Sequence, residues 1–265
     1  MGDKMGNLIK VCEDGNLEKV KSIIKSGMDI NKKYEDKNNM TALMVASSKG
    51  YLEIVKCLAE SGADINAQDN DGWGALMWAL DNEHFKVAEY LLEKGSDINA
   101  KNINGATALI IASSYGHFET AKYLLEKGAD INAKNDSNST ALIEASSIGN
   151  LEIVQYILAK VEKEKKVDID DKDNNGFSAL MYALNKGRTD IAKCLIEKGA
   201  DINTKDNNGW TALMYASKFG MVDVVKFLIK NNADANIKNK DGKIALDLAK
   251  NEEIKKLLAI QKMKY

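Results

Sequence analysis

Apolar and polar positions along this chain repeat about every 33 residues. Segment 206–238 shows the pattern in full: a polar turn (DNNG), a short stretch with small and apolar residues on one side (TALMYASKF), a glycine, and a second amphipathic stretch (VDVVKFLIK). Counterparts of TALMYAS begin at residues 41, 74, 107, 140, 178 and 211, with spacings of 33, 33, 33, 38 and 33 residues. A fixed period of about 20–50 residues is typical of a solenoid, in which each repeat covers the apolar face of its neighbour.

Each repeat is predicted to consist of two helices. In segment 206–238 the first helix is expected over 211–219, where Thr211 suits the N-cap because its hydroxyl accepts from an unpaired backbone N–H. A glycine then ends this helix, since glycine tolerates a positive φ. The second helix is expected over about 222–230, with apolar residues at helical spacing. Asn232 stands where other repeats have glycine, and Asn is the next best residue in the left-handed conformation that ends a helix.

The succession of turn, TxLxxA helix, glycine, IVxxLL helix and GADIN exit resembles the ankyrin repeat. The resemblance covers essentially the whole chain and recurs from repeat to repeat. One departure is uniform: the family's TPLH is TALM, TALI or a close variant here, and the chain has no proline. Without that proline the first helical turn loses a preset φ. The resemblance implies an all-α ankyrin-repeat solenoid with short hairpin loops.

We expect one domain over residues 1–265, built from eight repeats. The first and last have surfaces rich in Lys and Glu and are predicted to be caps, because a terminal repeat has one face in water. The boundaries are expected at 1–35, 36–68, 69–101, 102–134, 135–172, 173–205, 206–238 and 239–265.

Two repeats depart from the pattern. In the third, Gly74 replaces the capping Thr and Glu83 replaces the glycine between the helices, so this repeat is expected to open before its regular neighbours. In the fifth, VEKEKKV at 161–167 replaces two residues and adds five. That stretch is predicted to lengthen the second helix or to bulge on the outer face as a tolerated insertion, with a partner site as the alternative.

Composition argues against several classes of partner. The net charge is −2, and Arg188 is the only arginine among 37 basic residues, whereas phosphate and guanine recognition favours arginine. We therefore predict no nucleic-acid partner and no membrane partner. The chain start has no signal-peptide-like apolar region, and no apolar run approaches the roughly 18 residues that a membrane span needs, so a cytoplasmic protein is expected.

Several residues that could carry chemistry recur at equivalent positions, which points to structural roles. Cys12, Cys57 and Cys194 have neither disulfide nor zinc spacing. Cys57 and Cys194 share a position of the second helix where other repeats have Tyr or Phe, so we predict core thiols that act as small hydrophobic groups. His84 and His117 also share one position, just before the second helix, and neither has a nucleophile at a comparable place.

Segment 171–176 (DKDNNG) matches the first half of a calcium loop. The loop needs a bidentate Glu at its twelfth position, which is Tyr182 here. Comparison between repeats leaves no paired acid and base, no phosphate-binding glycine loop and no metal cluster. We therefore predict no cofactor, no metal and no enzymatic activity.

Positions that vary between repeats carry the information on function. Two of them, the residue after the turn and the last residue of the first helix, lie on the surface that the resemblance assigns to partner contacts. The predicted protein-binding residues are Met40, Trp73, Tyr115, Phe177, Trp210 and Phe219, with Asn207, Asn208 and Lys218 flanking the C-terminal patch. The alternative is that each aromatic ring packs on the adjacent turn. A third variable position, which holds Trp78, Tyr182 and Tyr215, is expected to lie in the core.

The pattern and the resemblance together predict non-catalytic recognition of a partner protein or peptide on the concave surface of a monomer. A structural or self-assembling spacer is the first alternative, and a mass that rises with concentration in light scattering would favour it. A small-molecule binder or an enzyme is the second alternative, and a well-ordered ligand in a closed pocket would favour that one.

Overall fold

The computed structural model describes residues 7–160 and 167–262. Regular structure in these residues is helical, with sixteen α-helices and one 3-10 turn, η1 (Glu35–Lys37), and extended backbone is limited to four isolated bridges at the turns. The predicted all-α fold is therefore confirmed. The chain forms two compact units, one of residues up to 112 together with 119–130, and the other of residues 113–118 together with those from 131 onward.

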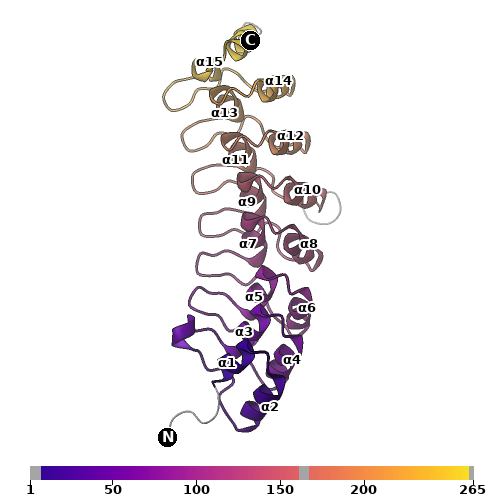
Figure 1. Cartoon of the computed structure of the whole chain (residues 1–265). Coiled ribbons are helices and arrows are strands. Elements are labelled where there is room, and N and C mark those ends of the chain that lie inside the picture. The colour runs from indigo at the N-terminus through magenta and orange to yellow at the C-terminus, as the bar shows by residue number, and fades with distance from the viewer. Residues whose placement is uncertain (1–6, 161–166, 263–265) are drawn as a thin grey trace. The chain divides into compact units, whose positions relative to one another are not determined.

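Helices of the first compact unit alternate between two rows, and the turns project from the first row away from the second (Figure 1). Each helix packs on its partner in the same repeat and on the next helix of its own row. The first row holds α1 (Leu8–Glu13), α3 (Ala42–Ser48) and α5 (Ala75–Asp81), and the second holds α2 (Leu17–Lys25), α4 (Leu52–Glu60) and α6 (Phe85–Glu93). The fourth repeat supplies α7 (Ala108–Tyr115) and α8 (Phe118–Glu126), and the boundary between the compact units runs through it.

The second compact unit repeats this arrangement. One row holds α9 (Ala141–Ile148), α11 (Ala179–Asn185), α13 (Ala212–Lys218) and α15 (Ala245–Leu248). The other row holds α10 (Leu151–Lys160), α12 (Thr189–Glu197), α14 (Val222–Lys230) and α16 (Glu252–Lys262). No helix in the described part of the chain combines the length and the apolar character that crossing a membrane requires.

The helices begin and end with the capping residues that the sequence predicts. The Thr211 side chain accepts from the Met214 N–H, and Thr41 caps its own helix in the same way. Asn232 has φ 65°, the left-handed conformation expected at the end of α14. The Leu of the TxLxxA motif is buried in every repeat that has it, as expected for a residue between layers: Leu43, Leu76, Leu109, Leu142, Leu180 and Leu213.

The third repeat has the two local defects that its sequence predicts. Gly74 occupies the N-cap of α5 without any side-chain hydrogen bond. Glu83 adopts φ 56°, a left-handed conformation that is unfavourable for a residue with a side chain. Both features weaken this repeat relative to the seventh, where Thr211 and Gly220 occupy the equivalent positions.

The cysteine position of the second helix is less buried than predicted. Cys57 and Cys194 are half-buried, so placing this position in the core was wrong, whereas Cys12 is fully buried. Tyr90 and Tyr123 at the same position in their repeats are half-buried as well, so partial exposure belongs to the position and not to the cysteine. The predicted effect of the 161–167 insertion falls outside the described residues, apart from Val167, which is buried.

Neighbouring turns of the second compact unit are joined by backbone hydrogen bonds. Asn207 N–H donates to Asn175 O at 3.1 Å, and Lys240 N–H donates to Asn208 O at 2.9 Å. Gly176 allows this close approach, because a Cβ on it would meet the Asn207 N at 2.7 Å, and its φ of +78° also favours glycine. The turns thus form a continuous ribbon rather than independent loops.

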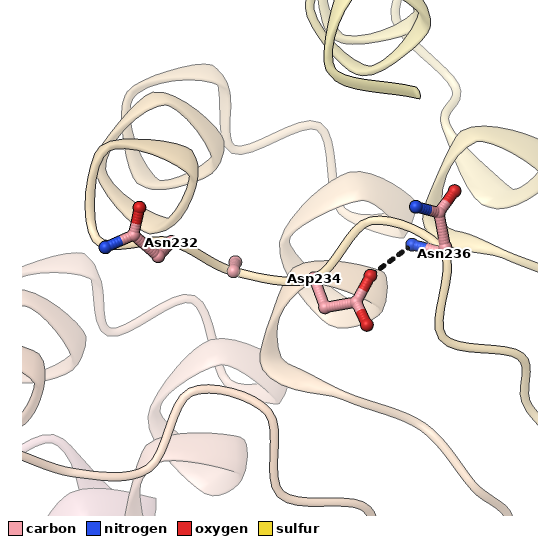
Figure 2. Close-up of a pocket in the computed structure, with 4 residues that line it drawn as sticks. Asn232, Asp234 and Asn236 are labelled. Atoms are coloured by element: carbon pink, nitrogen blue, oxygen red, sulfur yellow. Dashed lines mark hydrogen bonds between the residues drawn. The ribbon is translucent and has the colours of Figure 1, made fainter. Parts of the chain in front are cut away.

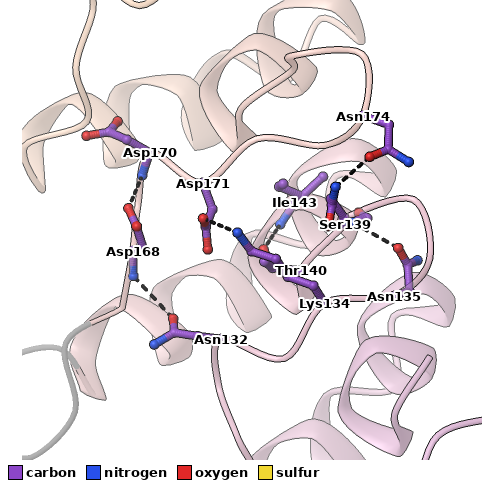
Figure 3. Close-up of polar contacts among 11 residues, drawn as sticks. Asn132, Lys134, Asn135, Ser139, Thr140, Ile143, Asp168, Asp170, Asp171 and Asn174 are labelled. Carbon is purple, nitrogen blue, oxygen red and sulfur yellow. Dashed lines mark hydrogen bonds and ion pairs between the residues drawn. The ribbon is translucent and has the colours of Figure 1, made fainter. Parts of the chain in front are cut away.

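The exit loops are linked by a second series of bonds, of which Figure 3 shows one part. Asp168 N–H donates to Asn132 Oδ1 at 3.2 Å, and Lys134 forms an ion pair with Asp171. Asp201 N–H donates to Asp170 Oδ1 at 2.8 Å in the same way. Because these residues have structural partners, the partial calcium-loop match at 171–176 is explained by the repeat itself.

Candidate protein-binding surface

Three repeats contain the same group of residues: an aspartate in the turn, an aromatic residue four positions later and a second aromatic residue nine positions later. We call this group the aromatic module. Its members are Asp69, Trp73 and Trp78 in the third repeat, Asp173, Phe177 and Tyr182 in the sixth, and Asp206, Trp210 and Tyr215 in the seventh.

The aspartate of the module uses both carboxylate oxygens. In the seventh repeat, Asp206 Oδ1 accepts from the N–H groups of Asn208 and Trp210, both at 2.8 Å, which closes the turn. Its Oδ2 accepts from the Tyr215 hydroxyl at 2.7 Å. Asp206 and Tyr215 are only 6% and 7% exposed, so this bond is shielded from water. One carboxylate therefore ties the turn to the first helix.

The same bonds recur in the other two modules. Tyr182 donates its hydroxyl to Asp173 Oδ2 at 2.8 Å. In the third repeat the donor is an indole, and Trp78 Nε1–H reaches Asp69 Oδ2 at 3.0 Å.

The second aromatic residue of each module supports the ring of the first. Ring centroids lie 5.1 Å apart for Trp210 and Tyr215, and 5.1 Å apart for Phe177 and Tyr182. Phe177 also lies 5.6 Å from Tyr215, which links the sixth repeat to the seventh. These are tilted contacts at the separations that aromatic pairs prefer. The result is a continuous series of rings on one side of α11 and α13.

The remaining regular turns lack all three parts of the module together. The second repeat has an aspartate, Asp36, but Met40 and Val45 at the two later positions. The other three begin with Asn, and neither later position is aromatic: Asn102 with Ala106 and Ile111, Asn135 with Ser139 and Glu144, and Asn239 with Lys243 and Leu248. An amide has a single acceptor oxygen, so it can close the turn but cannot also accept from a phenol or an indole. In Asn239 the buried Nδ2 indeed has no hydrogen-bond partner among the described residues. The two rings thus occur only in turns that begin with Asp.

The end of α13 adds an exposed rim to the module of the seventh repeat. Lys218 Nζ lies 4.8 Å from the Trp210 ring centroid and 5.5 Å from that of Phe219, at cation–π distances. Phe219 is 44% exposed, and Trp210 is half-buried. We define the C-terminal aromatic patch as Phe177, Trp210, Tyr215, Lys218 and Phe219.

The predicted binding residues are exposed to different degrees. Met40, Trp73, Phe177, Trp210 and Lys218 are half-buried, whereas Asn207 and Asn208 are exposed on the turn. Tyr115 is 64% exposed and makes a ring contact with His117 at 5.8 Å. The structure therefore groups Phe177, Trp210, Lys218 and Phe219, while Met40, Trp73 and Tyr115 lie outside this group. Which of these residues bind a partner stays a prediction.

Sequence reasoning missed the roles of two residues that hold the patch in place, Tyr215 and Asp206. Trp78, Tyr182 and Tyr215 were assigned to the core; Tyr215 is buried, but Trp78 and Tyr182 are only half-buried, so for these two the assignment was wrong. The Tyr215 ring also supports Trp210 and Phe177. Asp206 was treated as an ordinary turn residue. The signal that could have found both is the joint presence of Asp and an aromatic residue nine positions later in the same three repeats.

Burial keeps two tyrosines and one cysteine of this chain protonated at neutral pH. Burial, and then the hydrogen bond to Asp206, raise the pKa of Tyr215 well above its usual value, so the phenol stays protonated at neutral pH. Burial and the bond to Asp173 do the same for Tyr182. Burial also raises the pKa of the Cys12 thiol to about 12, which leaves it un-ionised and unreactive.

Other candidate sites in the described residues have fewer features that indicate a function. No group of three or more metal-binding side chains occurs within the described ranges. A hollow at the exit loop of the seventh repeat is lined by Asn232, Ala233, Asp234 and Asn236 (Figure 2). Asp234 Oδ1 accepts from the Asn236 N–H there, at 2.8 Å, in the turn geometry that other exit loops share. The hollow thus belongs to the repeat structure.

Comparison with known proteins agrees with the architecture. The model of the family described as "Ankyrin repeats (3 copies)" matches residues 8–102, 68–135, 96–173, 133–206, 161–241 and 199–264. Among solved structures, the ankyrin repeat domain of Bcl-3, described as a unique member of the IkappaB protein family, aligns with a TM-score of 0.75 and 26% sequence identity. That alignment covers 84% of this chain and 99% of the other. Comparison with curated protein sequences gave no match.

Proposed function

Since this chain belongs to the ankyrin-repeat family, a family that generally mediates protein–protein interaction, we propose that it recognises a partner protein and that the C-terminal aromatic patch carries most of the binding energy. The observation that carries this proposal is the half-exposed Trp210 ring, held from below by Tyr215 and flanked by the exposed Phe219. Asn207 and Asn208 of the turn border the patch and offer polar contacts at its edge.

Preorganisation is the main physical support. Binding energy is lost when side chains must be ordered at an interface, so a ring that is already fixed binds at a lower entropic cost. The bond from Tyr215 to Asp206 fixes the supporting ring, and the turn bonds from Asp206 fix the backbone of Trp210 itself. Trp and Tyr are also the residues most often found as interface anchors.

The patch also exposes apolar surface that the fold does not require. Turns with Ala106, Ser139 or Lys243 at the Trp210 position close with the same backbone geometry, through Asn102, Asn135 and Asn239. Exposed apolar groups that cluster on a protein surface commonly mark a site of interaction. We expect a monomer that works in the cytoplasm without catalysis, and a partner other than nucleic acid or membrane.

The decisive experiment begins with a partner recovered by affinity capture from the source organism and identified by mass spectrometry. Phe219→Ala should leave the melting temperature nearly unchanged and weaken binding by about 2 kcal/mol or more. Trp210→Ala should weaken binding at least as much, with a moderate loss of stability because the ring packs on Tyr215. Unchanged affinity in both variants would refute the assignment of the patch.

Two controls separate binding from folding. Leu213→Ala removes a side chain that is 1% exposed and should cost roughly 2–5 kcal/mol of stability, while the fraction that stays folded binds normally. Trp73→Ala truncates the equivalent ring of the third repeat, outside the C-terminal aromatic patch, and should weaken partner binding much less than Trp210→Ala does. Light scattering on the wild-type chain tests the alternative of a self-assembling spacer, which requires a mass that rises with concentration.

A further inference from the structure

Two turns of the second compact unit have the same sequence, Asp-Asn-Asn-Gly, over residues 173–176 and 206–209. Asn is a thermolabile residue, and its amide is most open to attack when Gly follows, because glycine has no side chain to hinder its own backbone nitrogen. That nitrogen forms a bond to the Asn Cγ, and the bond from Cγ to Nδ2 breaks. The amide nitrogen leaves as ammonia with the proton of the glycine N–H, and a succinimide ring remains. Water then opens the ring at either carbonyl, which gives aspartate or isoaspartate.

In both turns the attacking nitrogen is held by a hydrogen bond. Gly176 N–H donates to Asp173 O, and Gly209 N–H donates to Asp206 O, both at 2.9 Å. A nitrogen held in this way does not attack, so the reaction proceeds from molecules in which the turn has opened locally. The bonds that must break on opening therefore decide which of the two turns reacts, since their sequences are the same.

Side-chain bonds hold the turn of the sixth repeat closed. Asn175 Nδ2 donates to Asp173 Oδ2 at 3.3 Å, so the amide that would react is itself bonded. From the next turn, Asn207 Nδ2 donates to Asn174 O at 2.9 Å, in addition to the backbone bond from Asn207 N–H to Asn175 O. Gly176 is buried beneath these groups.

The turn of the seventh repeat lacks both of these side-chain bonds. The Asn208 side chain is exposed, and its amide has no hydrogen-bond partner in the described part of the chain. The next turn has Lys240 at the position of Asn207, and it reaches the seventh turn through its backbone, with Lys240 N–H donating to Asn208 O at 2.9 Å. Gly209 is half-buried, whereas Gly176 is buried. Opening the seventh turn therefore breaks fewer bonds than opening the sixth.

From this difference we propose that Asn208 is a site of spontaneous deamidation in the folded protein, through a succinimide formed with Gly209. The sixth turn is protected, and the third Asn-Gly pair of the chain, 104–105, has a buried glycine like that of the sixth turn. The reaction places a carboxylate at the edge of the C-terminal aromatic patch. In isoaspartate the main chain is also longer by a methylene group, which alters the bond from Lys240 N–H. The proposal does not depend on the proposed function.

The test is incubation of the full chain at neutral pH and physiological temperature, with peptide mapping by mass spectrometry over time. Trypsin releases the two turns in separate peptides, 173–186 and 206–218, because a lysine precedes and ends each of them. Asn208 should deamidate faster than Asn175 by about fivefold or more, the factor that corresponds to one typical net hydrogen bond. Isoaspartate should appear among the products, since direct hydrolysis of the amide gives aspartate alone. Products without isoaspartate would overturn the proposal.

The same chain unfolded in guanidinium chloride is the control, and there the two turns should react at similar rates because their sequences match. Equal rates at Asn208 and Asn175 in the folded protein, or reaction of Asn208 only in the denaturant, would overturn the proposal. Lys240→Asn tests the cause, since it supplies the amide that Asn207 provides to the sixth turn. It should slow the reaction at Asn208 about fivefold, and an unchanged rate would count against the proposal.

Discussion

The third and seventh repeats share the same assembly of an aspartate and two rings, and they differ in what surrounds it. Trp73 and Trp78 lie 4.9 Å apart, and Trp210 and Tyr215 lie 5.1 Å apart, each pair over a buried turn aspartate. Around the assembly, however, the third repeat has Asp81 and Asn82 where the seventh has Lys218 and Phe219.

This difference distinguishes the part of the assembly that stabilises the turn from the part that is proposed to bind a partner. Because the aspartate and its two rings occur in both repeats, the buried bonds are a way to build a rigid turn, whatever the repeat does. The exposed rim is present only in the seventh repeat of this pair, which is why the proposed recognition surface consists of the rim and the half-exposed face of Trp210. The third repeat also has the weaker helix ends, with Gly74 at the N-cap of α5 and Glu83 in a left-handed conformation.

The largest expected difference between the two repeats arises when the shared aspartate is replaced with Asn, the residue found at this position in other turns. Asp69→Asn should cost about 2 kcal/mol, because the indole N–H of Trp78 can only donate and would face an amide NH₂ or lose its partner. Asp206→Asn should cost only about 1 kcal/mol, because the phenol oxygen of Tyr215 can accept from the new amide. Chemical denaturation measures both.

Equal losses in these two variants would mean that the chemistry of the donor is irrelevant and that only the charge matters. Asn102→Asp supplies the control in the reverse direction. It adds a carboxylate to a turn that has Ile111 in place of an aromatic donor, so it should not stabilise the protein.

The fold could be predicted from the sequence more completely than the candidate site could. The fold could be predicted because every repeat carries its own signals, from the capping Thr211 to Asn232 at the end of α14. The candidate site could be predicted only as a set of variable aromatic positions. That Lys218 lies over Trp210 depends on side-chain rotamers across two turns of helix, and no periodicity reports them. The half-exposure of Cys57 was missed for a similar reason, since burial at this position depends on how neighbouring side chains pack.

At alkaline pH the contribution of the phenol donor Tyr215 to stability should decrease, whereas that of the indole donor Trp78 should not change. Burial, and then the bond to Asp206, hold the pKa of Tyr215 above its unfolded value of about 10. Its contribution to stability is therefore complete below pH 10 and should fall above it by about 1.4 kcal/mol per pH unit, because only the unfolded chain releases the proton.

The measurement compares the wild-type protein with Tyr215→Phe by urea denaturation between pH 8 and pH 11. The difference in unfolding free energy between the two should shrink above pH 10. Trp78→Phe is the matched control, since an indole does not titrate in this range, and its difference from wild type should stay constant. A constant difference for Tyr215→Phe as well would show that the phenol ionises equally in the folded protein.

Restoring the glycine between the helices of the third repeat should reduce the difference in local stability between the third and seventh repeats. Glu83 has φ 56°, so Glu83→Gly should relieve the left-handed strain and stabilise the third repeat by about 0.5–1 kcal/mol after the entropy cost of glycine. Hydrogen exchange of residues 81–84 should be faster than at the equivalent loop around Gly220 in the wild-type chain, and the variant should slow it. Gly220→Ala is the reverse control and should speed exchange in the seventh repeat. Uniform protection in both repeats of the wild-type chain would contradict this account.

Gly74→Thr is expected to have the smallest effect on stability. It tests whether the missing N-cap contributes to the weakness of the third repeat. The Gly74 backbone, at φ −94° and ψ 173°, matches that of Thr211 at −104° and 167°, so a threonine can adopt it without strain. A Cβ would approach Ala67 O at 3.3 Å, which requires a small backbone shift. A glycine cap is only a few tenths of a kcal/mol worse than threonine, so we expect a gain of about 0.3 kcal/mol in denaturation. A gain near 1 kcal/mol would show that the missing cap, rather than Glu83, is the main weakness of the third repeat, and Glu83→Gly should then have little further effect in the double variant.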